Sequence, residues 1–116
     1  METLYNIFIS TAERLLPLGG LFGEKLKLFS VGRKDTFEQL QKKISYSDRN
    51  IWIHAASLGE FEQAVPVIER IKADFAQFKI VLSFFSPSGY EIKKNNPLVD
   101  VVIYLPLDTK RNAKRF

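Results

Sequence analysis

The segment best suited to chemistry ends in Glu60, which follows the apolar run 51–56 and the turn Ser57-Leu58-Gly59. Such a run is typical of a buried strand, and open α/β sheets bind ligands at the carboxyl ends of their strands. A carboxylate there is suited to act as a general base toward a substrate hydroxyl, and Gly59 would let a ligand approach the backbone. The same residues also match a capping box, in which Ser57 caps a helix and Glu60 accepts from the Ser57 amide. The pattern alone favours this structural interpretation.

A second candidate is the turn Ser86-Pro87-Ser88-Gly89, which follows the apolar run 79–85. The hydroxyls of Ser86 and Ser88, with the amides of a helix N-terminus, are suited to hold an anion. Simple capping explains the Ser-Pro pair equally well. The turn lacks the Gly-x-Gly-x-x-Gly pattern of dinucleotide-binding sites, and the chain has no Walker-type Gly-Lys-Ser/Thr motif.

Several other chemistries are excluded by residue type. The chain has no cysteine, which excludes disulfides, thiolate metal sites and a cysteine nucleophile. His54 is the single histidine, so a histidine metal cluster is excluded, and we expect His54 to be a satisfied core residue. Ser57 is not framed by a Gly-x-Ser-x-Gly elbow, which argues against a serine hydrolase.

The chain is basic, with a formal net charge of +4 and a pI near 9.4. Four of its cations, Lys110, Arg111, Lys114 and Arg115, fall within the last seven residues. The charge favours phosphorylated or otherwise anionic partners. The alternative is that this cluster is only the solvated start of a helix and binds no partner. We expect Asp108 to be the N-cap of that helix.

Hydrophobic periodicity and breaker residues predict the elements that position these side chains. We expect a helix over 3–16 that ends at Pro17, an apolar piece over 21–29, and a helix over 36–44 with Asp35 and Glu38 as a capping pair. Strands are expected over 51–56, 79–85 and 99–105. Helices are expected over 58–75, where Pro66 should kink or divide the helix, from Ser86 to about Asn95, and from Asp108 onward.

Strands that alternate with helices through short connections predict an α/β fold with a parallel sheet. We therefore expect a helical N-terminal segment, residues 1–48, followed by a βαβαβ Rossmann-like half in residues 49–116. A chain of 116 residues is sufficient for one such domain.

The N-terminal segment has two apolar stretches, and the acidic Glu2 precedes the first where a secretory signal would have basic residues, which argues against such a signal. No stretch is long enough to span a bilayer. We expect residues 3–16 to pack on the domain as a helix; the alternative is an amphipathic helix on a membrane surface.

Taken together, four segments resemble the 3-deoxy-D-manno-octulosonic acid (Kdo) transferases. His54-Ala55-Ala56-Ser57-Leu58-Gly59-Glu60 resembles their His-Ala-x-Ser-x-Gly-Glu segment. Ser86-Pro87-Ser88-Gly89 resembles their Thr-Pro-Thr-Gly turn, and Tyr104-Leu105-Pro106-Leu107-Asp108 their Tyr-x-Pro-x-Asp segment. Gly32-Arg33-Lys34 resembles the Gly-Arg-Lys that follows their N-terminal helix. The order and spacing agree over most of the chain.

The resemblance implies the N-terminal domain of a GT-B glycosyltransferase, which transfers Kdo from CMP-Kdo to a lipid A precursor with inversion and without a cofactor or metal. Glu60 would be the general base, and Ser57, Gly59, Ser86, Ser88 and Gly89 would contact substrate. CMP-Kdo would bind a C-terminal domain outside this chain, so we expect the chain alone to be inactive. The expected location is the cytoplasmic face of the inner membrane in Gram-negative bacteria, with a membrane surface as partner and no nucleic acid.

Two other functions remain open. One is a non-catalytic nucleotide- or phosphate-binding half-domain that uses the helix N-termini at Ser57 and Ser86. The other is a membrane-surface module formed by residues 1–29 and the basic C-terminal cluster. The chain also lacks the Glu-x-Glu segment that Kdo transferases carry soon after this point.

Overall fold

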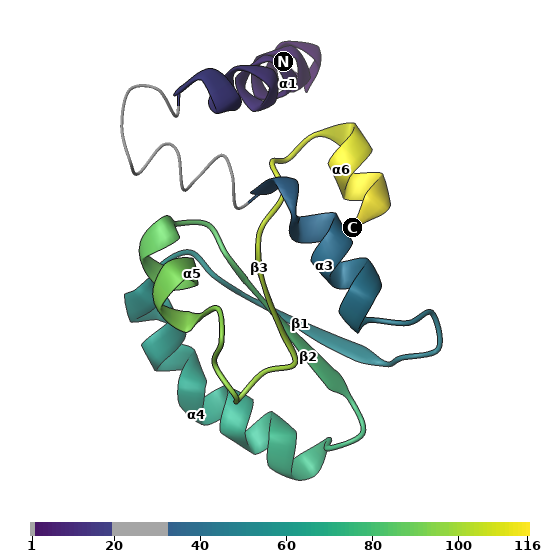
Figure 1. Cartoon of the computed structure of the whole chain (residues 1–116), viewed down its shortest axis with the longest axis vertical. Helices are drawn as coiled ribbons and strands as arrows, with labels where there is room; N and C mark the ends of the chain where they lie inside the picture. Colours follow the sequence, from purple (N-terminus) through teal and green to yellow (C-terminus); the bar gives the residue numbers. More distant parts are fainter. Residues whose placement is uncertain (1, 20–32) are drawn as a thin grey trace.

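The computed structural model describes residues 2–19 and 33–116 (Figure 1). The apolar piece expected over 21–29 and Gly32 of the Gly-Arg-Lys segment lie outside the described residues. The described chain is an α/β fold, as the alternation of apolar runs and breaker residues predicts.

Three parallel strands form the sheet in the order β1-β2-β3. They are β1 (Asn50–Ala55), β2 (Lys79–Phe84) and β3 (Val101–Tyr104). The register aligns Ala55 with Phe84, and Phe84 with Tyr104, so all three carboxyl ends lie at one edge of the sheet. The predicted parallel βαβαβ arrangement is confirmed.

Helices cover the two faces of the sheet unequally (Figure 1). On one face, α4 (Leu58–Asp74) and α5 (Pro87–Lys93) bury the main core, which includes Phe61, Ile68, Leu82, Phe84 and Tyr104. On the other face, α3 (Thr36–Lys43) packs over β3, with Leu40 against Val101 and Ile103. The Thr36 hydroxyl is fully buried and donates to the Tyr104 carbonyl at 2.9 Å, which fixes α3 to the end of β3.

The prediction that β1 is a buried strand is wrong. Its side chains alternate, so that Ile51 and Ile53 are half-buried while Trp52 is 52% exposed and His54 is also exposed. The physical reason is position: β1 is an edge strand of this sheet, and α3 covers β3 instead. The expectation that His54 belongs to the core is therefore wrong as well.

The starts and ends of several helices differ from expectation. The first helix, α1 (Glu2–Gly19), continues beyond Pro17, since proline removes one backbone hydrogen bond but has a φ that suits a helix. Asp35 makes no side-chain cap on α3, because its backbone is already helical. The cap of α6 (Lys110–Arg115) is Thr109, whose side chain accepts from the Asn112 amide at 3.1 Å, not Asp108. Of the two alternatives for Pro66, a division of the helix is wrong, since α4 is one helix that contains this proline.

Hydrogen bonds join α1 to the segment around α6. The Tyr5 hydroxyl donates to the Asp108 carboxylate at 2.8 Å. Asp108, which was expected to cap α6, therefore bonds to α1 instead. The Asn112 side chain donates to Glu13 at 2.7 Å. The apolar stripe of α1 stays exposed, namely Leu4, Ile7, Phe8 and Leu15, at 54–70%. In the described part of the chain, no helix is both long and apolar enough to cross a bilayer.

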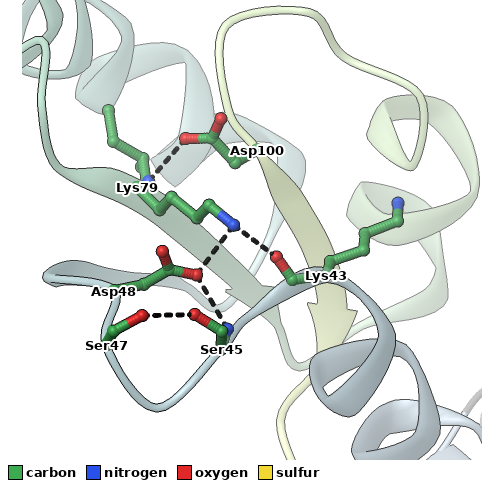
Figure 2. A network of polar contacts seen from close by, with 7 residues as sticks. Lys43, Ser45, Ser47, Asp48, Lys79 and Asp100 are labelled. Atoms are coloured by element: carbon green, nitrogen blue, oxygen red, sulfur yellow. Dashed lines mark hydrogen bonds and ion pairs between the residues drawn. The ribbon is translucent and has the colours of Figure 1, made fainter.

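Polar side chains at the amino ends of β1 and β2 are engaged with each other and with backbone (Figure 2). Lys79 Nζ lies 2.8 Å from Asp48 Oδ2 and donates to the Lys43 carbonyl at 2.7 Å. Asp48 also accepts from the Ser45 amide, and Asp100 accepts from the Ile80 amide, both at 2.7 Å. This network connects the loop after α3 to β2, so the amino edge has a structural role.

Candidate functional site at the carboxyl edge of the sheet

Glu60 lies in the first turn of α4, directly beyond the end of β1, and its side chain is exposed. Its Oε2 accepts a hydrogen bond from the Ala56 amide at 2.7 Å. One carboxylate oxygen is thereby held against the strand end. The other has no hydrogen-bond partner among the described residues, so the carboxylate is both oriented and accessible.

The predicted capping box does not form, because neither of its two hydrogen bonds is made. Glu60 reaches back beyond the expected Ser57 amide to that of Ala56, and the Ser57 side chain makes no cap bond. Ser57 still occupies the N-cap position with an extended backbone, at φ −142° and ψ 172°. Its hydroxyl is therefore available to a ligand beside the carboxylate.

The two carboxyl-edge turns are joined through one peptide group. The Ser86 amide donates to the Ala56 carbonyl at 3.0 Å, while the Ala56 amide donates to Glu60. Ser86 and Ser88 share a hydrogen bond between their hydroxyls at 2.7 Å, and Ser86 does not cap α5 with its side chain. The fold thus brings Glu60 and the Ser86-Ser88 turn into one connected region.

The two glycines of these turns have different environments. Gly59 is exposed, and a Cβ built there meets nothing within 4 Å, so the backbone beside Glu60 is open to a ligand. Gly89 is buried, and a Cβ there would collide with the Phe84 ring, with 2.6 Å to Cε1. The small size of Gly89 is therefore needed for α5 to pack on β2.

Arg33 also reaches this edge from the segment before α3. Its Nη2 donates to the Phe85 carbonyl at 2.7 Å, and its guanidinium lies 5.0 Å from the centroids of the Phe85 and Tyr104 rings. Burial lowers the pKa of Arg33 to about 10, so it stays charged at neutral pH. The sequence pointed to Arg33 only through the Gly-Arg-Lys resemblance, because its partners are distant in the chain.

Ser83 is a polar residue that the sequence analysis missed. It is fully buried, its Oγ accepts from Trp52 Nε1 at 2.8 Å, and it lies 2.9 Å from His54 Nδ1. With Trp52 donating to Oγ, the hydroxyl hydrogen can go to Nδ1, which favours the tautomer protonated at Nε2. The sequence feature that could have identified Ser83 is that it is a lone serine within the otherwise apolar 80–84 run.

Within the described residues, no three His, Asp or Glu side chains come close enough together to hold a metal ion. The arrangement that remains is an oriented carboxylate, open serine hydroxyls and an accessible glycine backbone. Such a group is suited to accept a proton from a hydroxyl that approaches the edge of the sheet.

The sequence of this chain is similar to those of known transferases. A family model described as 3-deoxy-D-manno-octulosonic-acid transferase (kdotransferase) matches residues 23–116. Curated proteins with similar sequences include the 3-deoxy-D-manno-octulosonic acid transferase of Aquifex aeolicus, 36% identical over 67 residues, and that of Haemophilus influenzae, 37% identical over 70 residues. The probable mitochondrial 3-deoxy-D-manno-octulosonic acid transferase of Arabidopsis thaliana is 37% identical over 67 residues.

These alignments cover 57%, 59% and 57% of this chain but only 18%, 16% and 15% of the three relatives, so the chain matches less than a fifth of their length. No solved structure gives a significant match. Because the family model spans most of the chain, this chain belongs to the 3-deoxy-D-manno-octulosonic-acid transferase family.

Proposed function

We propose that this chain is the acceptor-binding part of an inverting glycosyltransferase that transfers Kdo from CMP-Kdo to a lipid A precursor. The observation that carries the proposal is the exposed Glu60 carboxylate, oriented by the Ala56 amide at the carboxyl edge of a parallel sheet. Ligands of open α/β sheets bind at this edge.

In the proposed reaction, Glu60 takes the proton of a primary hydroxyl on the glucosamine disaccharide. The hydroxyl oxygen attacks the anomeric carbon of Kdo as the bond to CMP breaks, and CMP leaves with the bonding electrons. Ser57, Gly59 and the Ser86-Ser88 turn border the approach to Glu60 and would position the acceptor. Gly89 would act indirectly, by holding α5 close to β2.

The donor would bind in a second domain outside these residues, so the 116-residue chain alone would not complete transfer. The proposed site of action is the cytoplasmic face of the inner membrane. The exposed apolar stripe of α1 and the positive net charge favour a partner surface of anionic lipid.

The test is Glu60→Gln in the complete enzyme, with CMP release measured in the presence of CMP-Kdo and the lipid A precursor. Loss of general-base catalysis should lower kcat by about 10²–10⁴-fold. Glu69→Gln, an exposed change on the same helix, is the matched control and should leave the rate unchanged. Full activity of Glu60→Gln would contradict the proposal. Nucleotide binding by the chain itself, with no need for Glu60, would favour the non-catalytic alternative.

A further inference from the structure

Residues of α1, of the start of α3 and of α6 line a cavity of about 620 Å³. Its floor includes Pro106 and Leu107, which follow the carboxyl end of β3. The cavity therefore lies at the same edge of the sheet as Glu60, although none of the residues proposed to contact the reacting groups lines it.

The lining of this cavity is strongly basic. Among the described residues that line it there is one carboxylate, that of Glu13, and there are six cationic side chains: Arg14, Arg33, Lys34, Lys110, Arg111 and Arg115. Glu13 accepts a hydrogen bond from the neutral Asn112 amide at 2.7 Å, so its charge is not paired with any of these cations. An excess of positive charge in one concave site favours an anion of high charge density.

Three of the cations have no partner among the described residues, namely Arg14, Lys34 and Arg111, and all three are exposed. Lys110 pairs with Glu2 at 3.3 Å, a contact on the surface that water screens. The Arg115 guanidinium lies 3.9 Å from the centroid of the Phe37 ring. This contact with the ring keeps the guanidinium in the cavity wall and leaves its N–H groups available. Two N–H groups of one arginine can bind two oxygens of a phosphate group at once.

Hydrogen bonds connect the wall of the cavity to the proposed base. Arg33, in the wall, donates to the Phe85 carbonyl, and the next residue, Ser86, donates through its amide to Ala56. The Ala56 amide in turn orients Glu60. An anion held by the cavity would therefore be fixed relative to the carboxylate.

We propose that the cavity between α1, α3 and α6 is a binding site for a phosphate monoester, and that its ligand is a phosphate group of the glycolipid acceptor. The identity of the ligand rests on the proposed function; the affinity for phosphate rests on the cavity alone. A phosphate monoester carries nearly two negative charges at neutral pH, which the six cations would offset. Binding would present the sugar of the acceptor to Glu60.

The test compares the wild type with the double variant Arg14→Gln/Arg111→Gln and, separately, with Lys34→Gln. Calorimetry would measure binding of inorganic phosphate and of an acyl-free glucosamine disaccharide bisphosphate. Each lost charge-assisted hydrogen bond should raise the dissociation constant about tenfold, and the double variant about a hundredfold. Lys114→Gln is the control, because Lys114 lies on α6 like Arg111 but does not line the cavity. It should change the dissociation constant less than twofold.

A second set of measurements identifies the ligand and separates this inference from the proposed function. In the complete enzyme, the double variant should raise KM for the acceptor and leave kcat nearly unchanged, whereas Glu60→Gln should lower kcat and bind the disaccharide normally. Unchanged binding of inorganic phosphate by folded cavity variants would overturn the phosphate site. Loss of binding to phosphatidylglycerol vesicles with unchanged disaccharide binding would overturn the acceptor as ligand. Retained transfer by Glu60→Gln, with weakened disaccharide binding by the double variant, would overturn only the catalytic role.

Discussion

The Glu60 carboxylate accepts its hydrogen bond from the Ala56 amide, the first residue after β1, at 2.7 Å. A standard capping box would use the Ser57 amide instead. The carboxylate is thus anchored to the end of the strand and not only to its own helix. Because the Ala56 carbonyl also accepts from Ser86, the position of Glu60 depends on both carboxyl-edge turns.

We expect Glu60→Ala to lower the free energy of unfolding by about 1 kcal/mol, the usual effect of losing a helix-capping interaction. Glu60→Gln should have a smaller effect, because its amide oxygen can still accept from Ala56. Urea unfolding monitored by circular dichroism gives both values. Glu69→Ala, exposed in the middle of α4, controls for the gain in helix propensity. Equal stability of the Ala and Gln variants would show that the bond to Ala56 contributes nothing.

The two turn glycines predict opposite responses to alanine. Gly89→Ala should lower the free energy of unfolding by about 1–3 kcal/mol, since the added methyl group overpacks the Phe84 ring. Gly59→Ala adds its methyl group in open space at the start of a helix and should raise stability by up to about 1 kcal/mol. Thermal and urea unfolding of the two variants test the contrast. A Gly89→Ala variant as stable as the wild type would contradict the packing role.

The order and type of the elements could be predicted because local signals agree with the fold. Apolar runs, the Ser86-Pro87 start and the polar linkers each indicate the same alternation of strands and helices. The strand that α3 covers could not be predicted from the sequence. Trp52 and His54 are exposed because α3 crosses β3 and not β1, and no pattern within residues 51–56 carries that information.

The candidate site was predictable where chemistry and position coincide in the sequence, as in Glu60 and the Ser86-Ser88 turn. Their connection through Ala56 was not, because the amide and carbonyl groups of the backbone carry no residue signature. Arg33 and the cavity it borders were also beyond the sequence pattern. They depend on contacts between α1, α3 and α6, which lie far apart in the chain.

The amino-edge network predicts an acid-dependent loss of stability. Hydrogen bonds from Lys79 and from the Ser45 amide hold the pKa of Asp48 below its ordinary value of 3.8. A carboxylate with a lowered pKa in the folded state stabilises the fold above its unfolded pKa, and this contribution is lost as pH falls through the folded pKa. Stability should therefore decline below about pH 4 more steeply in the wild type than in Asp48→Asn.

Urea unfolding at a series of pH values from neutral to strongly acidic measures this difference. The gap in stability between wild type and Asp48→Asn should be largest near neutral pH and should shrink as Asp48 becomes protonated. Asp35→Asn, an exposed carboxylate without a hydrogen-bonded partner among the described side chains, serves as the control. A gap that does not change with pH would mean that the ionised form of Asp48 is not favoured by folding.

The exposed stripe of α1 predicts binding to a lipid surface. Leu4 is 69% and Phe8 is 70% exposed, and neither takes part in the hydrogen bonds that join α1 to Asp108 and Asn112. Burying such side chains in the interface of a bilayer is worth about 1.5–3 kcal/mol each. Leu4→Ser/Phe8→Ser should therefore weaken partitioning into phosphatidylglycerol vesicles by at least about tenfold. Val67→Ser, which changes an exposed apolar residue on α4, should leave partitioning unchanged.

Because the cavity cations also attract anionic lipid, the measurement is repeated on vesicles of neutral phosphatidylcholine, where only the apolar contribution remains. Equal partitioning of the double variant and the wild type on both vesicles would contradict a membrane role for α1.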